Sequence, residues 1–192
     1  MRIIGGRFRG KRLAAPAAAG GGGAHLRPTS DRVRESLFNL LAHGRFGEPP
    51  PPEGRRVLDL FAGTGALGLE ALSRGAARAV FIDDLPAARA LIRANAEALG
   101  LTGEVKIWRR DATRLGLCRG EPFGLIFADP PYGSALGGRA LASAQQGGWI
   151  APEAIVVLEH AAAETAPAAD WLHITDRRRY GDTAITIFRA GG

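Results

Sequence analysis

The chain has 192 residues, of which 46% are hydrophobic and 23% charged, values typical of a single folded domain with a sizeable core. No apolar run approaches the roughly 20 residues of a membrane helix, no apolar segment follows the basic N-terminus as in a secretory signal, and the single Cys118 excludes an internal disulfide, so we expect a cytoplasmic protein. The net charge of +6 is concentrated in residues 1–34, where eight cations against Asp31 alone give +7. Such a segment attracts polyanions, unless it is a solvated arm that only aids solubility.

The N-terminal part of the sequence predicts a basic extension followed by a helix. Residues 1–13 are compatible with a β-hairpin, and residues 14–24 contain only alanine, glycine and proline, as a loop or linker does. Good helix caps at 29–31 precede apolar residues at helical spacing, which predicts an amphipathic helix over 31–42. We expect residues 1–26 to form an RNA-binding extension and residues 27–192 to form the main domain.

From residue 56 onward the pattern alternates strands with helices. We expect strands at 57–61, 79–82, 105–108, 123–128 and 154–158, helices at 66–74, 86–99 and 136–146, and a closing antiparallel hairpin formed by 171–175 and 184–188. Repeated βα units predict an α/β fold, with a mostly parallel, Rossmann-like seven-stranded sheet covered by helices on both faces. Such a sheet binds ligands at the C-terminal ends of its strands.

A glycine-rich turn follows the first of these strands. Gly63 and Gly65 would let the backbone approach a ligand closely, and the next helix would present free N–H groups beside it. The spacing of Gly63, Gly65 and Gly68 also matches the dinucleotide fingerprint, so the turn alone leaves NAD(P), S-adenosylmethionine or no ligand open. Asp59 favours S-adenosylmethionine, because a carboxylate would attract its ammonium group and repel a pyrophosphate.

Carboxylates also follow the next two strands. Asp83 could accept hydrogen bonds from both hydroxyls of a ribose, and Asp84 is the competing candidate. The alternative for either residue is capping of the helix that begins at Pro86. Asp111 follows the third strand and could accept a hydrogen bond from an adenine amino group.

The most specific signal is the run of Asp129, Pro130, Pro131 and Tyr132 after the fourth strand. Prolines fix φ and lack an N–H, which leaves the carbonyls of Asp129 and Pro130 free to accept from the exocyclic amine of a nucleobase. Tyr132 offers a stacking face worth about 1–3 kcal/mol per base. Asp129 could take the released proton, directly or through water. The alternative interpretation is a rigid Pro-Pro turn without chemistry.

Residues 59–75 together with 129–132 resemble the class I S-adenosylmethionine-dependent methyltransferases that act on base amino groups. The segments 2–13, 27–41 and 179–183 narrow the resemblance to the bacterial RsmD-type 16S rRNA guanine-N2 methyltransferases. The resemblance implies methyl transfer to the N2 amine of a specific guanine of 16S rRNA, with the small ribosomal subunit or its rRNA as partner and no metal. The candidate cofactor-binding residues are then Asp59, Phe61, Ala62, Gly63, Gly65, Asp83, Asp84, Asp111 and Ala112, and the candidate catalytic residues are Asp129, Pro130, Pro131 and Tyr132.

The substrate side is predicted to use the basic residues of the N-terminal part. The candidate RNA-binding residues are Arg7, Arg9, Lys11, Arg12, Arg27 and Arg34, which would make binding salt-dependent, and the target base would be turned out of its stack. The four histidines show no metal-ligand spacing, and the lack of a heptad seam favours a monomer. The alternatives are a DNA adenine-N6 methyltransferase, an NAD(P)-dependent oxidoreductase and a non-enzymatic RNA-binding module.

Overall fold

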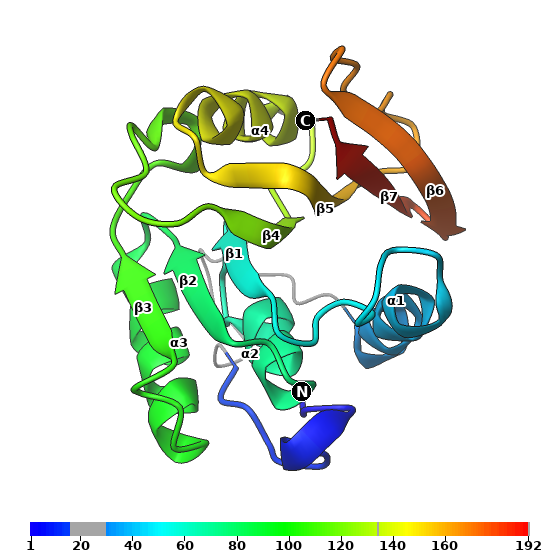
Figure 1. The fold of residues 1–192 in the computed structure, drawn as a ribbon. Helices are drawn as coiled ribbons and strands as arrows, with labels where there is room; N and C mark the ends of the chain where they lie inside the picture. The colour runs from blue at the N-terminus through cyan, green and yellow to red at the C-terminus, as the bar shows by residue number, and fades with distance from the viewer. Residues whose placement is uncertain (16–29, 134, 192) are drawn as a thin grey trace.

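The computed structural model describes residues 1–15, 30–133 and 135–191 and contains one seven-stranded sheet (Figure 1). The strands lie in the order β3-β2-β1-β4-β5-β7-β6. The first five are parallel, whereas β7 is antiparallel to β5 and β6 is antiparallel to β7. The predicted mostly parallel sheet with a closing hairpin is therefore confirmed. The strands are β1 (Arg56–Leu60), β2 (Arg78–Ile82), β3 (Val105–Trp108), β4 (Phe123–Ala128), β5 (Ile150–Ala161), β6 (Leu172–Tyr180) and β7 (Thr183–Ala190).

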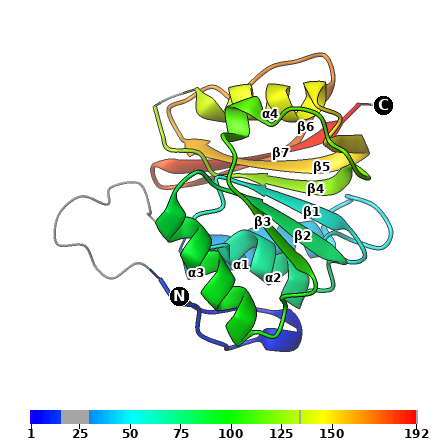
Figure 2. The ribbon, with the colours of Figure 1, turned by 90° about the vertical axis from the view of Figure 1, so that its left-hand side faces the viewer.

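Helices cover both faces of the sheet, as Figure 2 shows. Helices α1 (Asp31–His43), α2 (Ala66–Ser73) and α3 (Pro86–Ala98) lie on one face, and α4 (Leu136–Gln146) lies on the other. Two short 3-10 turns, Gly6–Phe8 and Ala112–Arg114, complete the described elements. The arrangement places α2 directly after the glycine-rich turn, with its N-terminus at the C-terminal edge of the sheet.

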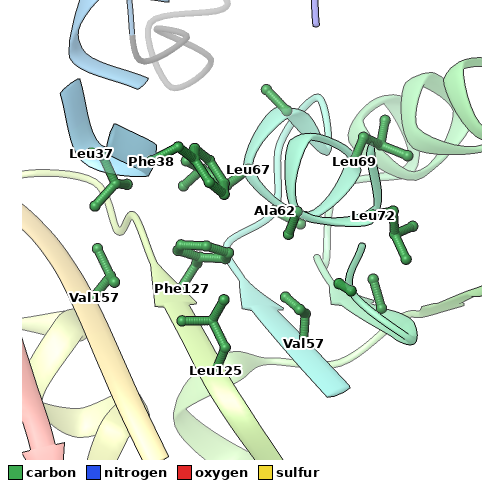
Figure 3. Close-up of a cluster of buried hydrophobic side chains, with 14 of the residues drawn as sticks. Leu37, Phe38, Val57, Ala62, Leu67, Leu69, Leu72, Leu125, Phe127 and Val157 are labelled. Atoms are coloured by element: carbon green, nitrogen blue, oxygen red, sulfur yellow. The ribbon is translucent and has the colours of Figure 1, made fainter. Parts of the chain in front are cut away.

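The apolar side chains of the central strands β1 and β4 alternate between two hydrophobic clusters, because successive residues of a strand point to opposite faces. Figure 3 shows one cluster, in which Phe38 of α1 and Leu67 of α2 lie over Val57, Leu125 and Phe127. The rings of Phe38 and Phe127 are 5.7 Å apart between centroids. Burial of each such side chain contributes about 1.5–3 kcal/mol, so this packing fixes the strand ends that carry the polar residues.

The observed strand bounds differ from the prediction most at β5 and at β6, which continues to Tyr180 and not to 175, and by a single residue at each end of β1. β1 ends at Leu60 because Phe61 adopts a left-handed backbone with φ of 57°, which turns the chain into the glycine-rich segment. β5 begins at Ile150 and not at 154, because it continues through an irregularity where Glu153 has φ of 60° and the register with β4 shifts. A proline such as Pro152 usually indicates that a strand is interrupted, but here a bulge accommodates it within β5.

The N-terminal extension pairs like a hairpin without forming regular strands. A single bridge joins Arg2 to Arg12, and the backbone N–H groups of Ile3 and Gly10 donate to the carbonyls of Lys11 and Ile3, both at 2.9 Å. Ile3 and Leu13 are buried in the cluster of Figure 3. Most of the predicted linker lies outside the described residues, so the division at residue 26 stays a prediction.

Candidate active site

A pocket of about 390 Å³ opens at the C-terminal ends of β1, β2, β3 and β4, the edge where parallel sheets bind ligands. The predicted residues that line it are Asp59, Phe61, Ala62, Gly63, Asp83, Asp84, Asp111, Ala112, Asp129 and Pro131. The structure therefore brings strand ends that are up to 70 residues apart in the chain around one cavity. Three of the predicted site residues, Gly65, Pro130 and Tyr132, do not line this pocket. Of these, Pro130 and Tyr132 line a neighbouring pocket.

The glycine turn is shaped by residues that adopt left-handed backbone conformations. Gly63 has φ of 54° and Gly65 has φ of 77°, a region in which a side chain is strained. A Cβ on Gly65 would also meet Cγ1 of Ile92 at 3.1 Å, so Gly65 contributes to the shape of the turn and not to the pocket wall. Gly68 is needed for close packing, because its Cβ would meet the Phe81 ring at 2.4 Å.

Asp59 is the most buried carboxyl group of the pocket. Its side chain is 1% exposed, and its Oδ2 accepts a hydrogen bond of 2.9 Å from the backbone N–H of Gly68. Burial raises the pKa of Asp59 to about 8, the Gly68 N–H opposes this shift, and the negative charge of Asp83 adds to it. A cation entering the pocket would lower this pKa, so the site favours a positively charged group beside Asp59.

Asp83 connects the end of β2 to the glycine turn. Its Oδ2 accepts from the backbone N–H of Gly63 at 2.8 Å, and its Oδ1 accepts from that of Leu85 at 2.9 Å. Burial raises the pKa of Asp83, while these two hydrogen bonds lower it. Asp84 is exposed and lines the pocket. The bond to Leu85 shows that Asp83 shapes the loop before α3 as well as the turn.

Asp111 lies at the other end of the pocket, where it caps a 3-10 turn. Its Oδ1 accepts from the backbone N–H of Thr113 at 2.8 Å and from the Thr113 hydroxyl at 2.7 Å. These bonds lower the pKa of Asp111, which therefore remains ionised at neutral pH. Its carboxylate retains lone pairs toward the pocket that it lines.

The turn formed by the candidate catalytic residues 129–132, called the catalytic turn below after that prediction, joins two cavities. Asp129 and Pro131 line the large pocket, whereas Pro130, Pro131 and Tyr132 line a second pocket of about 160 Å³ that also contacts Leu158, His160 and Glu164. The Asp129 N–H donates to the carbonyl of Leu60 at 3.4 Å, which joins the end of β4 to that of β1. The turn thus stands between the large pocket and a second hollow.

The Tyr132 ring is held from its hydroxyl end. The hydroxyl donates to Oε1 of Glu159 at 2.8 Å and lies 2.7 Å from the hydroxyl of Thr183. Burial raises the Tyr132 pKa, as does the neighbouring Glu159 carboxylate, so the phenol remains neutral. The side chain is still 44% exposed, which leaves a fixed aromatic surface at the mouth of the site.

Several residues around the pocket escaped the sequence interpretation. Arg110, Thr113, Leu136 and Arg139 line it, and Glu159 and Thr183 hold Tyr132. Arg110 was detectable, since it directly precedes Asp111 after a strand. Arg139 and Glu159 carry no local signal, because only the packing of α4 and β5 against the strand ends brings them near.

Comparison with known proteins gives a consistent result. The family model described as "Conserved hypothetical protein 95" matches residues 1–189. Ribosomal RNA small subunit methyltransferase D of Escherichia coli is 38% identical over 174 residues, covering 89% of this chain and 81% of the relative. YlbH of Bacillus subtilis is 34% identical over the full length of both proteins. The solved structure of Escherichia coli yhhF has a TM-score of 0.82 at 30% identity and covers 100% of this chain and 98% of its own.

The chain belongs to the ribosomal RNA small subunit methyltransferase D family. Membership confirms the resemblance predicted from the glycine turn, the catalytic turn and the terminal segments. It also confirms the Rossmann-like methyltransferase fold, because the likeness to yhhF extends over the whole chain. In the part of the chain that the structure describes, no cluster of side chains suited to a metal ion is found, and no helix is long and apolar enough to cross a membrane.

The prediction that Arg34 contacts RNA is wrong. Its side chain is 0% exposed and lies between α1 and α2, where it donates to Oδ1 of Asp31 at 3.0 Å and to the carbonyl of Arg2, and forms an ion pair of 3.7 Å with Glu70. Glu70 also accepts from the N–H groups of Ile4 and Gly5, both at 2.8 Å. Arg34 therefore fixes the N-terminal extension to the main domain.

Replacing Arg34 by methionine should lower the free energy of unfolding by about 3 kcal/mol, because removal of one partner from a buried ion pair is strongly destabilising. Thermal unfolding measures the effect, and Arg32→Met is the matched control, since Arg32 is exposed on the same helix. Equal unfolding temperatures for the two variants would show that the buried ion pair contributes nothing.

The other candidate RNA residues of the extension lie at the surface. Arg7, Arg9, Lys11 and Arg12 are exposed, and Arg27 lies outside the described residues. Arg7 forms an ion pair of 2.5 Å with Glu104, which directly precedes β3. Strand β3 runs toward the pocket, so the tip of the extension lies at the opposite edge of the sheet from the catalytic turn. Whether these residues bind RNA stays a prediction.

Proposed function

We propose that the protein transfers a methyl group from S-adenosylmethionine to the exocyclic N2 amine of one guanine in 16S rRNA. The observation that carries the proposal is that Asp129 and Pro131 of the catalytic turn line the same pocket as the glycine turn and the strand-end carboxylates. A donor in that pocket would lie next to acceptors for an aromatic amine. The related methyltransferase D proteins support rRNA as the substrate class.

The residues present fit the proposed cofactor. Asp59 is a buried carboxyl group whose raised pKa favours a cationic neighbour such as the ammonium group, and Asp83 or Asp84 would hold the ribose. Asp111 would accept from the adenine amine at the far end. The cofactor supplies an activated methyl sulfonium, so the protein mainly aligns the reactants and excludes water. NAD(P) fits less well, because Asp59, Asp83 and Asp84 would face its negative pyrophosphate.

The catalytic turn would hold the target amine. The carboxylate of Asp129 and the carbonyl of Pro130 accept its two hydrogens, which directs the nitrogen lone pair toward the methyl group. The nitrogen forms the new bond in line as the bond to sulfur breaks, and Asp129 takes the released proton directly or through water. Tyr132, fixed by Glu159 and Thr183, stacks on the extruded base.

The proposal also covers the partners. The exposed cations Arg9, Lys11 and Arg12 would contact rRNA phosphates away from the catalytic turn. The protein would act as a monomer in the cytoplasm, on free 16S rRNA or on an assembled or assembling small subunit.

The decisive experiment is methylation of small subunits from a strain that lacks the endogenous enzyme. Purified protein and methyl-labelled S-adenosylmethionine should incorporate label into 16S rRNA, and mass spectrometry of digested nucleosides should find N2-methylguanosine. N6-methyladenosine in DNA would instead favour the adenine enzyme. Thermal stabilisation by NADH but not by S-adenosylmethionine would favour an oxidoreductase, and RNA binding without incorporation would favour a binding module.

Cofactor affinity should rise with pH up to about 8, the pKa of Asp59 in the protein before the cofactor binds. Below that pH the carboxyl group is protonated, so binding of a cation beside it must release a proton. Affinity should therefore increase by up to about tenfold per pH unit between pH 6 and 8 and then level off. Calorimetry in buffers of different ionisation enthalpy would detect the proton, and a flat profile would contradict the assignment.

The raised pKa of Asp59 has the opposite effect on the stability of the protein without cofactor, which should fall as the pH rises. Because the pKa of Asp59 is raised from 3.8 to about 8, the folded state keeps a proton that the unfolded chain releases. Its contribution to stability is complete below about pH 4 and declines as pH rises to about 8. Bound cofactor should reduce this decline, because it favours the ionised carboxylate.

A further inference from the structure

The C-terminal hairpin, β6 and β7, brings a run of three arginines to the catalytic edge of the sheet, the edge that carries the catalytic turn. Thr183 pairs with both Ala161, the last residue of β5, and Tyr180, the last residue of β6. Because β5 is parallel to β4, the turn between β6 and β7 lies at the same edge as the catalytic turn. The hydrogen bond of 2.7 Å between Tyr132 and Thr183 confirms this proximity. The run of Arg177, Arg178 and Arg179 precedes that turn and is separated from it by Tyr180 alone.

Two of the three arginines share a face with the second pocket. Residues paired across a ladder point to the same side of a sheet. Arg177 is opposite Thr186, which is opposite Leu158, and Arg179 is opposite Ala184, which is opposite His160. Both Leu158 and His160 line the 160 Å³ hollow beside Tyr132. Arg178 falls on the other face of the sheet.

The two faces differ in how their arginines are neutralised. Arg178 makes two bonds to the carboxylate of Asp176, at 2.7 and 3.0 Å. Arg177 and Arg179 instead donate to the carbonyls of Glu164 at 3.3 Å and Gly181 at 2.8 Å. Within the described ranges, neither of the two forms an ion pair with a carboxylate. They are exposed cations with further N–H groups available.

Arg177 is linked to the catalytic turn through a single residue. The Glu164 whose carbonyl it contacts also accepts, through Oε1, a hydrogen bond of 2.5 Å from the N–H of Gly133, which follows Tyr132. A ligand on Arg177 would therefore lie beside the residues that are proposed to hold the target base. The tip of the N-terminal extension, by contrast, lies at the opposite edge.

We propose that Arg177 and Arg179 bind successive backbone phosphates of the RNA strand that carries the target base. Residues two apart on a strand are separated by about 6.8 Å and point to one side, which suits a run of negative charges. Guanidinium groups bind phosphate bidentately. The inference rests on the proposed function. It assigns binding of the RNA strand that carries the target base to the C-terminal hairpin, whereas the N-terminal extension would contact rRNA elsewhere.

The test compares R177Q/R179Q with the wild type in methylation of small subunits at several salt concentrations. We expect KM for the subunit to rise about tenfold, which corresponds to a loss of about 1.4 kcal/mol of binding free energy. The values of kcat and of the cofactor affinity should stay unchanged. The slope of log KM against log salt should fall by about 1.4, or 0.7 for each single-strand phosphate contact. Wild-type values of both KM and slope would overturn the proposal.

Two further variants control for charge and folding. R178Q/R189Q removes the same charge from the same hairpin at residues paired with Asp176 and Glu153, so its KM and slope should match the wild type. R177K/R179K should keep most of the slope, and a loss equal to that of the glutamine pair would refute phosphate binding. If the wild type incorporates no methyl group, the proposed function fails, whereas filter binding of 16S rRNA to the same variants still tests the arginine pair.

Discussion

Replacing Asp129 by alanine should reduce methyl transfer by about 10²–10⁴-fold, the contribution typical of a positioned acid or base. Asp129 lines the 390 Å³ pocket at the end of β4, and its N–H donates to the carbonyl of Leu60 at the end of β1. The variant removes both the proposed side-chain acceptor for the amine and the group proposed to take its proton. Cofactor affinity should stay unchanged, because the glycine turn and Asp83 remain in place.

Single-turnover rates on small subunits, with the cofactor saturating, isolate this effect. Asp129→Asn is the informative companion, since it keeps a hydrogen-bond acceptor of the same shape and removes the base. If orientation of the amine dominates, the asparagine variant should retain much of the rate that alanine loses. Undiminished transfer by the alanine variant would refute the role of Asp129.

Replacing Asp83 by alanine should weaken cofactor binding on the order of a hundredfold. The change leaves the N–H groups of Gly63 and Leu85 without their acceptor, at a cost of about 1–3 kcal/mol for each. It also removes the carboxylate proposed to hold the ribose. Calorimetric titration with S-adenosylhomocysteine measures the loss without turnover.

Asp84→Ala is the matched control for this experiment. Asp84 lines the same pocket but is exposed, so its removal should change the affinity little. A larger loss for Asp84→Ala than for Asp83→Ala would assign the ribose to Asp84 and leave Asp83 with a role in shaping the turn.

The path of the chain through the fold was largely predictable because its signals are local. Alternating strands and helices, the left-handed glycines at 63 and 65, and the proline that begins α3 depend on neighbouring residues alone. A parallel sheet then requires its strand ends to meet at one edge. That rule is sufficient to bring Asp59, Asp83, Asp111 and Asp129 around a common pocket.

Whether an individual charged residue is buried or exposed, and which edge of the sheet it lies at, was decided only by the tertiary structure. Arg34 looked like part of a basic surface, but its position on α1 faces α2, where the buried Glu70 and the carbonyl of Arg2 surround it. Arg7 forms an ion pair with Glu104 at the edge of the sheet that lies opposite the pocket. Arg177 and Arg179 reach the catalytic edge because β6 pairs with β7 and not directly with β5.

The sequence by itself determined the order of the elements, the glycine turn and the catalytic turn, since each depends on backbone preferences and spacing within a few residues. The tertiary structure alone decided which cations are buried, which face the catalytic edge, and that Glu159 and Thr183 fix Tyr132. These contacts join residues 27 and 51 positions apart, and side-chain burial depends on the packing of whole elements. No local pattern encodes such contacts.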